Sequence, residues 1–91
     1  MEQVAGTNRG DVTLYALSTC VWCKKTRKLL DGLGVGYSYT YVDLLPPDER
    51  QRAIKEIERW NPNCSFPTVV VNNERCIVGY KEDEIREALG G

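Results

Sequence analysis

Hydrophobic and polar positions along the chain follow two spacings, one typical of strands and one typical of helices. Short segments rich in β-branched and aromatic residues predict four strands, at residues 12–16, 37–42, 68–71 and 74–78. Longer segments with apolar residues at helical spacing predict three helices, at residues 20–33, 47–60 and 82–89. The predicted order is therefore β-α-β-α-β-β-α.

The connections between these elements indicate the fold class. A helix separates the first two strands, so these strands should be parallel and joined by a right-handed crossover. Asn72 and Asn73 suit a two-residue turn, which makes the last two strands an antiparallel hairpin with Cys76 opposite Val69. The sequence predicts an α/β fold with one four-stranded mixed sheet and helices on both faces.

The length of 91 residues predicts one domain. Residues 1–10 are polar and glycine-containing, so we expect a flexible N-terminal arm ahead of a domain at residues 11–91. No apolar run approaches the roughly 18 residues of a membrane span, and the first residues lack the apolar core of a secretory signal. A cytoplasmic protein with no membrane partner is expected.

Charge and composition narrow the possible functions. The chain has 12 basic and 13 acidic residues, a formal net charge of −1, so no nucleic-acid partner is expected. It contains no histidine, which excludes a histidine general base and histidine metal ligands. In a reducing compartment, a disulfide among the four cysteines is more often catalytic than structural.

Cys20 and Cys23 carry the sharpest chemical signal, because they lie where a predicted strand ends and a helix begins. Unpaired N–H groups and the helix dipole stabilise a thiolate there. Cys20 is the first thiol and is interpreted as the nucleophile, with Cys23 one turn later as the resolving thiol. Two alternatives are incidental thiols and a zinc site completed by Cys64 and Cys76.

Three motifs together resemble one known family. Residues 19–23 resemble the active site of glutaredoxins, which belong to the thioredoxin superfamily. Residues 65–68 match the place of the cis-proline loop of that family, and residues 78–83 match its glycine-containing turn. The resemblance covers about residues 11–89 and implies a thioredoxin-like glutaredoxin fold.

The resemblance also implies a substrate site beside the two cysteines. The peptide bond before Pro67 is expected to be cis, and the backbone of Phe66 is expected to pair with a bound thiol substrate. A carboxylate at Glu82 or Asp83 is a candidate to hold a substrate ammonium group, although Asp83 could equally be a helix cap. The expected substrate-binding residues are Thr19, Val21, Trp22, Phe66, Pro67, Gly79, Tyr80, Glu82 and Asp83.

Several positions depart from the commonest glutaredoxin pattern. Val21 and Trp22 stand where that pattern has proline and tyrosine, and Leu17 stands where a lysine often contacts glutathione. The spacing of Cys20, Cys23 and Thr26 is similar to that of NrdH-type redoxins, which take electrons from thioredoxin reductase and reduce ribonucleotide reductase. Glutathione, another low-molecular-weight thiol and a flavoprotein reductase are therefore all candidate electron donors.

The leading interpretation is a monomeric dithiol thiol–disulfide oxidoreductase that reduces protein disulfides or mixed disulfides between a protein and a small thiol. It needs no tightly bound cofactor and no resident metal. The alternatives are a carrier that bridges a [2Fe–2S] cluster through Cys20 and an NrdH-like electron donor. Cys64 is expected to be a partly buried small residue, and Cys76 is expected to pack in the core.

Overall fold

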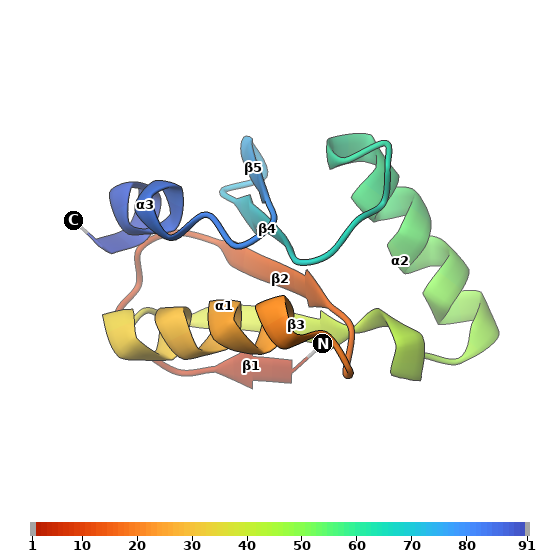
Figure 1. Cartoon of the computed structure of the whole chain (residues 1–91), viewed down its shortest axis with the longest axis horizontal. Helices are drawn as coiled ribbons and strands as arrows, with labels where there is room; N and C mark the ends of the chain where they lie inside the picture. The colour runs from red at the N-terminus through yellow and green to blue at the C-terminus, as the bar shows by residue number, and fades with distance from the viewer. Residues whose placement is uncertain (1, 91) are drawn as a thin grey trace.

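A five-stranded mixed sheet forms the centre of the computed structural model, which describes residues 2–90 (Figure 1). The strands are β1 (Glu2–Val4), β2 (Val12–Ala16), β3 (Tyr37–Tyr41), β4 (Thr68–Val71) and β5 (Arg75–Val78). The helices are α1 (Val21–Leu33), α2 (Pro47–Trp60) and α3 (Glu82–Ile85), with a 3₁₀ turn η1 (Val42–Leu44) and a π-helical turn η2 (Arg86–Gly90). Met1, the first residue of the predicted arm, and Gly91, the last residue of the predicted domain, lie outside the described residues.

The strand order is β1-β3-β2-β4-β5, and it confirms the predicted fold class. The strands β2 and β3 are parallel, whereas β4 is antiparallel to both β2 and β5. The predicted number of four strands is wrong, because β1 adds a fifth by pairing antiparallel with β3. This strand lies within the segment predicted as an arm, and its three residues are too few to show a period in the sequence.

Glycine lets the N-terminal segment cross the end of α1. Thr7 forms a bridge with Val35, and a β-carbon on Gly6 would lie within 2.7 Å of the backbone of residues 34–36. No larger residue fits at Gly6 without moving this backbone. The pairing of β1 therefore depends on contacts that hydrophobic spacing does not reveal.

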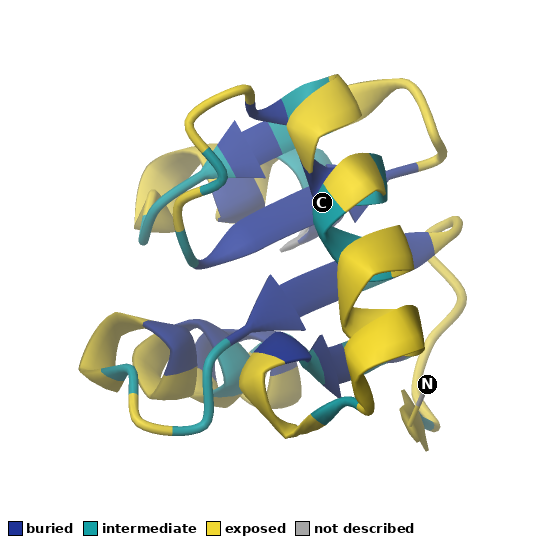
Figure 2. Ribbon diagram, turned by 90° about the vertical axis from the view of Figure 1, so that its right-hand side faces the viewer, coloured by how far each residue is buried: buried dark blue, intermediate teal, exposed yellow. Residues whose placement is uncertain are grey.

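Most of the central strands are buried (Figure 2), and their side chains alternate between two layers of the core. Val12, Leu14 and Ala16 of β2 face α1 and α3, while Tyr15 faces α2 and contacts the layer that contains Ile57. This is the period-two pattern of a sheet covered on both sides. The prediction of helices on both faces is therefore confirmed.

The β4–β5 hairpin has a three-residue loop, not the predicted two-residue turn. Val71 pairs with Arg75, and residues 72–74 form the loop, with Asn72 and Asn73 at φ values of 55° and 56°. The additional loop residue moves the register by one, so Cys76 lies opposite Val70 rather than Val69. Cys76 is half-buried on the α2 side of the sheet, and the expectation that it packs in the core is wrong.

Candidate active site

Cys20 is the N-cap residue of α1. Its backbone is extended, with φ −88° and ψ 118°, and its Sγ accepts a hydrogen bond from the backbone N–H of Cys23 at 3.2 Å. An oxygen from Ser, Thr, Asp or Asn usually fills this position. Here the sulfur satisfies one of the otherwise unpaired N–H groups at the helix start.

Cys23 lies behind Cys20 on the inner face of α1. Its side chain is only 1% exposed, whereas Cys20 is half-buried and more accessible. Burial, together with a hydrogen bond to Cys20, raises the pKa of Cys23 to about 12. The two thiols therefore differ strongly: Cys20 is the accessible one, and Cys23 is held as a neutral thiol.

The loop before Cys20 is anchored by a contact that the sequence analysis missed. The backbone N–H and the hydroxyl of Ser18 both donate hydrogen bonds to the carboxylate of Asp43. These bonds lower the pKa of Asp43. The register of the sheet explains the contact: β2 and β3 are parallel with Ala16 opposite Tyr41, so the residues two positions further along each strand meet at the same sheet edge.

The residues expected from the cis-proline loop and the glycine turn form a groove beside α1. The Phe66–Pro67 peptide bond is cis, and the backbone N–H of Gly79 donates to the carbonyl of Pro67 at 2.8 Å. The rings of Trp22 and Tyr80 are stacked with centroids 5.8 Å apart. The groove has a volume of about 310 Å³ and is lined by Trp22, Phe66, Pro67, Val78, Gly79, Tyr80 and Lys81.

Four of the predicted substrate-binding residues lie outside this groove. Thr19 is exposed in the preceding loop, and Val21 is 61% exposed at the start of α1. Glu82 and Asp83 line a neighbouring hollow of about 460 Å³. The Glu82 carboxylate already accepts hydrogen bonds from the Tyr80 hydroxyl and the Arg86 guanidinium, and it forms an ion pair with Arg86.

Two further residues of the site were not singled out from the sequence. Lys81 lines both the groove and the neighbouring hollow. Asn61, predicted only to end a helix, is buried and donates to the carbonyl and hydroxyl of Ser65 at 3.2 Å and 2.8 Å. These bonds order the segment that leads into the cis-proline loop, a long-range role with no distinct sequence signature.

The structure does not assemble the zinc site considered from the sequence. Cys64 lies in the loop after α2 and Cys76 lies on β5, and all four cysteines are free. Within residues 2–90, no three side chains of His, Cys, Asp or Glu are grouped so that they could hold a metal ion. The alternative that combines both cysteine pairs around one ion is therefore not supported.

Comparison with known proteins agrees with this geometry. The family model described as Glutaredoxin matches residues 12–76, which include both cysteines and the cis-proline loop. The chain belongs to the glutaredoxin family. A search of curated proteins gave no match.

Solved glutaredoxin structures extend the similarity to nearly the whole chain. The glutaredoxin from Methanosarcina mazei Go1 is 56% identical, with a TM-score of 0.94, and the match covers 99% of this chain and 87% of that one. Methanosarcina acetivorans methanoredoxin is 57% identical, with a TM-score of 0.92 and coverages of 94% and 90%. A glutaredoxin from Archaeoglobus fulgidus is 32% identical, with a TM-score of 0.83 and coverages of 90% and 88%.

Membrane insertion by a helix has no support in the described part of the chain. Among residues 2–90, no helix combines the length and the apolar character that a membrane span requires.

Proposed function

We propose that this glutaredoxin is a dithiol thiol–disulfide oxidoreductase, with Cys20 as nucleophile and Cys23 as resolving thiol. The observation that carries the proposal is the asymmetry of the two thiols at the start of α1. The sulfur of Cys20 accepts a backbone hydrogen bond at an accessible helix terminus, and Cys23 is buried directly behind it. An accessible nucleophile at a helix start and a resolving thiol that is kept protonated suit thiol–disulfide exchange.

The proposed reaction transfers two electrons in two exchanges. The Cys20 thiolate attacks one sulfur of the substrate disulfide, a mixed disulfide forms, and the other substrate sulfur leaves as a thiolate that takes up a proton. Cys23 then loses its proton and attacks the Cys20 sulfur. The substrate leaves as a second thiol, and the Cys20–Cys23 pair becomes a disulfide. No tightly bound cofactor is required in either step.

Restoring the dithiol requires an external reductant. Two molecules of glutathione, or of another low-molecular-weight thiol, would be oxidised to their disulfide in this step; a thioredoxin-reductase-type flavoprotein would supply the same two electrons. The groove beside Trp22 and Tyr80 is the proposed place for a small thiol or for the chain of a protein substrate. The substrates proposed are protein disulfides and mixed disulfides between a protein and a small thiol.

Turnover of a small disulfide tests this function directly. Wild type, Cys20→Ser and Cys23→Ser would be compared with glutathione plus its reductase, and separately with thioredoxin reductase. We expect wild-type turnover with one of these donors and loss of at least about 100-fold in Cys20→Ser, because the nucleophile is removed. Equal rates in wild type and Cys20→Ser would contradict the proposal.

The same protein sample distinguishes the iron–sulfur alternative. After anaerobic reconstitution with iron and sulfide, a cluster bridged through Cys20 would give a brown protein with visible absorbance that is lost in Cys20→Ser. For the oxidoreductase, we expect disulfide turnover in protein that contains no stoichiometric iron.

A further inference from the structure

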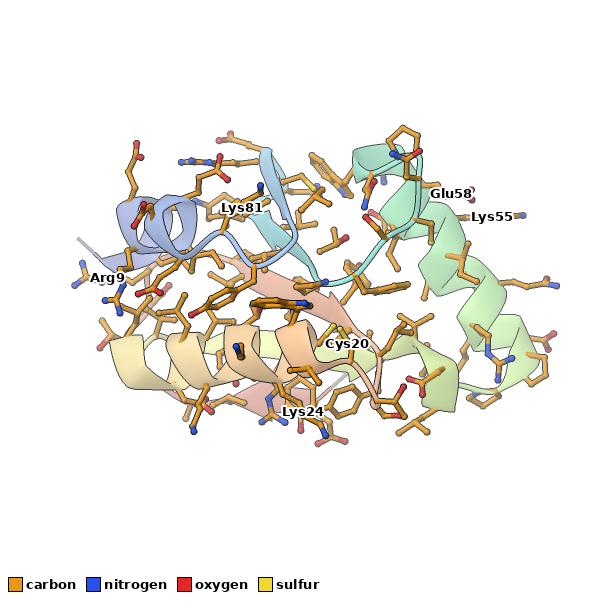
Figure 3. All side chains as sticks on the ribbon, in the orientation of Figure 1. Arg9, Cys20, Lys24, Lys55, Glu58 and Lys81 are labelled. Carbon is orange, nitrogen blue, oxygen red and sulfur yellow. The ribbon has the colours of Figure 1, made fainter. Side chains whose placement is uncertain are left out.

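The exposed face of α1 carries an unusual concentration of positive charge next to the active site. Cys20 caps the helix, and Lys24 and Lys28 follow at intervals of four residues, which places all three on one side of α1. Both lysines are exposed. Lys24, whose side chain leaves α1 close to Cys20, is labelled in Figure 3. A charged stripe therefore begins at the nucleophile and continues along the helix.

Arg27 completes this stripe and is held in place by tyrosines of β3. Its guanidinium lies 3.9 Å from the centroid of the Tyr39 ring and donates hydrogen bonds to the hydroxyls of Tyr37 at 3.2 Å and Tyr41 at 3.1 Å. Stacking and hydrogen bonding of this kind leave the charge uncompensated while restricting the side chain. We call Lys24, Arg27 and Lys28 the basic face of α1.

The basic face of α1 is concave. Its three cations line a hollow of about 260 Å³ together with Asp31 and Tyr41. Asp31, the only acid in α1, accepts a hydrogen bond from the Tyr37 hydroxyl at 2.8 Å. The hollow therefore keeps an excess of two positive charges, and it has room for the carboxylate of another molecule.

The other two helices differ from α1 in how they balance charge. On α2, Arg59 pairs with Glu56, and next to α3, Arg86 pairs with Glu82. Among the described residues, no ion pair involves a side chain of α1, so the cations of α1 are not neutralised in this way. On the opposite side of the groove, the first turn of α3 carries three acids, at residues 82–84. The active site thus lies between a basic helix face and an acidic helix turn.

We propose that the basic face of α1 docks an acidic segment of the protein whose disulfide reacts with Cys20. This inference rests on the proposed function, because the partner is the protein substrate of that reaction. Carboxylates near the reacting cysteine would be attracted to Lys24 and Lys28 and repelled by the acids at the start of α3. The two charged regions would therefore orient the partner as well as accelerate its association.

Short peptides provide the test. Each peptide contains one cysteine in a mixed disulfide with 2-mercaptoethanol, flanked on both sides by glutamate, glutamine or lysine. The quantity measured is the single-turnover rate of reduction by the pre-reduced protein, expressed as the ratio of the glutamate peptide to the glutamine peptide. A general change in the reactivity of Cys20 cancels in this ratio, and no external electron donor is needed.

We expect the wild-type ratio to be about 10 at low salt and to approach 1 at about 1 M salt, where the Debye length is about 3 Å. Neutralising the face in Lys24→Gln/Lys28→Gln should reduce the ratio to about 2, and reversing it in Lys24→Glu/Lys28→Glu should bring it below 1. Lys55→Gln is the matched control, because Lys55 is an exposed lysine on α2, away from Cys20 (Figure 3). It should keep the wild-type ratio.

A wild-type ratio near 1, or an equal fall of the ratio in Lys55→Gln, would overturn the docking proposal while leaving the oxidoreductase function intact. If wild type reduces none of the peptides, the proposed function fails instead. Docking is then measured separately with serine in place of the peptide cysteine. Amide chemical shifts of residues 24–28 should respond to the glutamate peptide and not to the lysine peptide, and no response would overturn the docking proposal.

Discussion

Cys20, Cys64 and Cys76 are all half-buried, yet their surroundings differ. The Cys20 sulfur accepts a backbone N–H at the start of α1. Cys64 lies in the loop after α2 with φ 49°, and Cys76 lies within β5, opposite Val70. In the described part of the chain, no hydrogen bond to the sulfur of either of these two residues is formed. Accessibility alone therefore does not distinguish Cys20 from Cys64 and Cys76.

Burial raises the pKa of thiols in both regions of the molecule. It raises the pKa of Cys64 and of Cys76, and the nearby charge of Glu58 raises that of Cys64 further. Neither residue has a helix terminus or a cation that would offset the loss of solvation. At the start of α1, burial raises the pKa of Cys23, while the Cys20 sulfur accepts a backbone hydrogen bond. The comparison teaches that the hydrogen-bond donor, and not exposure, distinguishes Cys20, the proposed nucleophile, from the other two cysteines.

Selective alkylation is the strongest test of this comparison. We expect iodoacetamide to modify Cys20 at least about 100-fold faster than Cys64 or Cys76 in the native, reduced protein at neutral pH, because only the thiolate reacts. Mass spectrometry of peptides after short exposures measures the rate at each site. In the urea-unfolded chain the four rates should become similar, and rates that already match in the native protein would contradict the comparison.

The pKa of Cys23 predicts how stability depends on pH. The value of about 12 in the folded protein lies above the ordinary value of 9.0, so ionisation favours the unfolded chain. The stabilising contribution is complete below pH 9 and is lost as the pH rises toward 12. We expect Cys23 to account for a loss of roughly 2 kcal/mol in the free energy of unfolding between pH 9 and 10.5.

Urea unfolding of the reduced protein across this range measures the loss. Cys23→Ala is the control, because it retains the tyrosines whose pKa values are also raised, Tyr15 and Tyr37. The slope attributed to Cys23 should disappear in this variant. Parallel pH profiles for the two proteins would show that Cys23 ionises normally in the folded state.

Removing the contact between Ser18 and Asp43 should have a smaller effect, on the rate at which Cys20 reacts. Ser18→Ala removes the hydroxyl donor to the Asp43 carboxylate, and we expect the loosened loop to lower the single-turnover rate of Cys20 about 3-fold to 5-fold. Asp43→Asn should have a similar effect, and the double variant should be no slower than either single variant. Additive losses would indicate that the two residues act separately.

The acid dependence of stability provides a second measurement of this contact. The pKa of Asp43 is lowered by its hydrogen bonds, so their contribution is present above the ordinary value of 3.8 and is lost as the pH falls through the folded-state pKa. The urea midpoints of wild type and Ser18→Ala should therefore differ at neutral pH and converge in acid. A difference that persists unchanged in acid would exclude the carboxylate as its cause.

The smallest effect on turnover is expected when Cys64 or Cys76 is replaced. Cys64→Ser and Cys76→Ala should each change the turnover of a small disulfide by less than about 2-fold, because neither thiol belongs to the proposed reaction. The turnover assay used for Cys20→Ser measures this. A larger loss in either variant, with an unchanged urea midpoint, would assign that cysteine a role in the redox cycle.

Local patterns explain why much of the fold and the central chemistry were predictable. Period-two and helical spacing identified β2, α1 and α2, and the position of Cys20 at a strand–helix junction marked it as the proposed nucleophile. The strands, the helices and the junction depend on neighbours within a few positions, which the sequence shows directly. The cis bond and the groove wall were expected from the resemblance of residues 65–68 and 78–83 to glutaredoxin motifs.

Other features were missed because they depend on distant contacts. The strand β1 is stabilised by pairing with β3 and by the close crossing at Gly6, and the hairpin register depends on one additional loop residue. The separation of Glu82 and Asp83 from the groove was also not predictable, since it follows from how the turn after Gly79 packs against α1.

The sequence by itself determined the α/β order and the place of Cys20 and Cys23, the cysteines of the proposed reaction, at a helix start, because helix capping, strand alternation and the three-residue spacing of Cys20 and Cys23 are local. The tertiary structure alone decided that Ser18 meets Asp43, that Trp22 stacks on Tyr80 and that Arg27 lies against Tyr39. Each of these contacts joins residues on different elements. Their geometry exists only after the sheet has ordered its strands and the helices have packed against it.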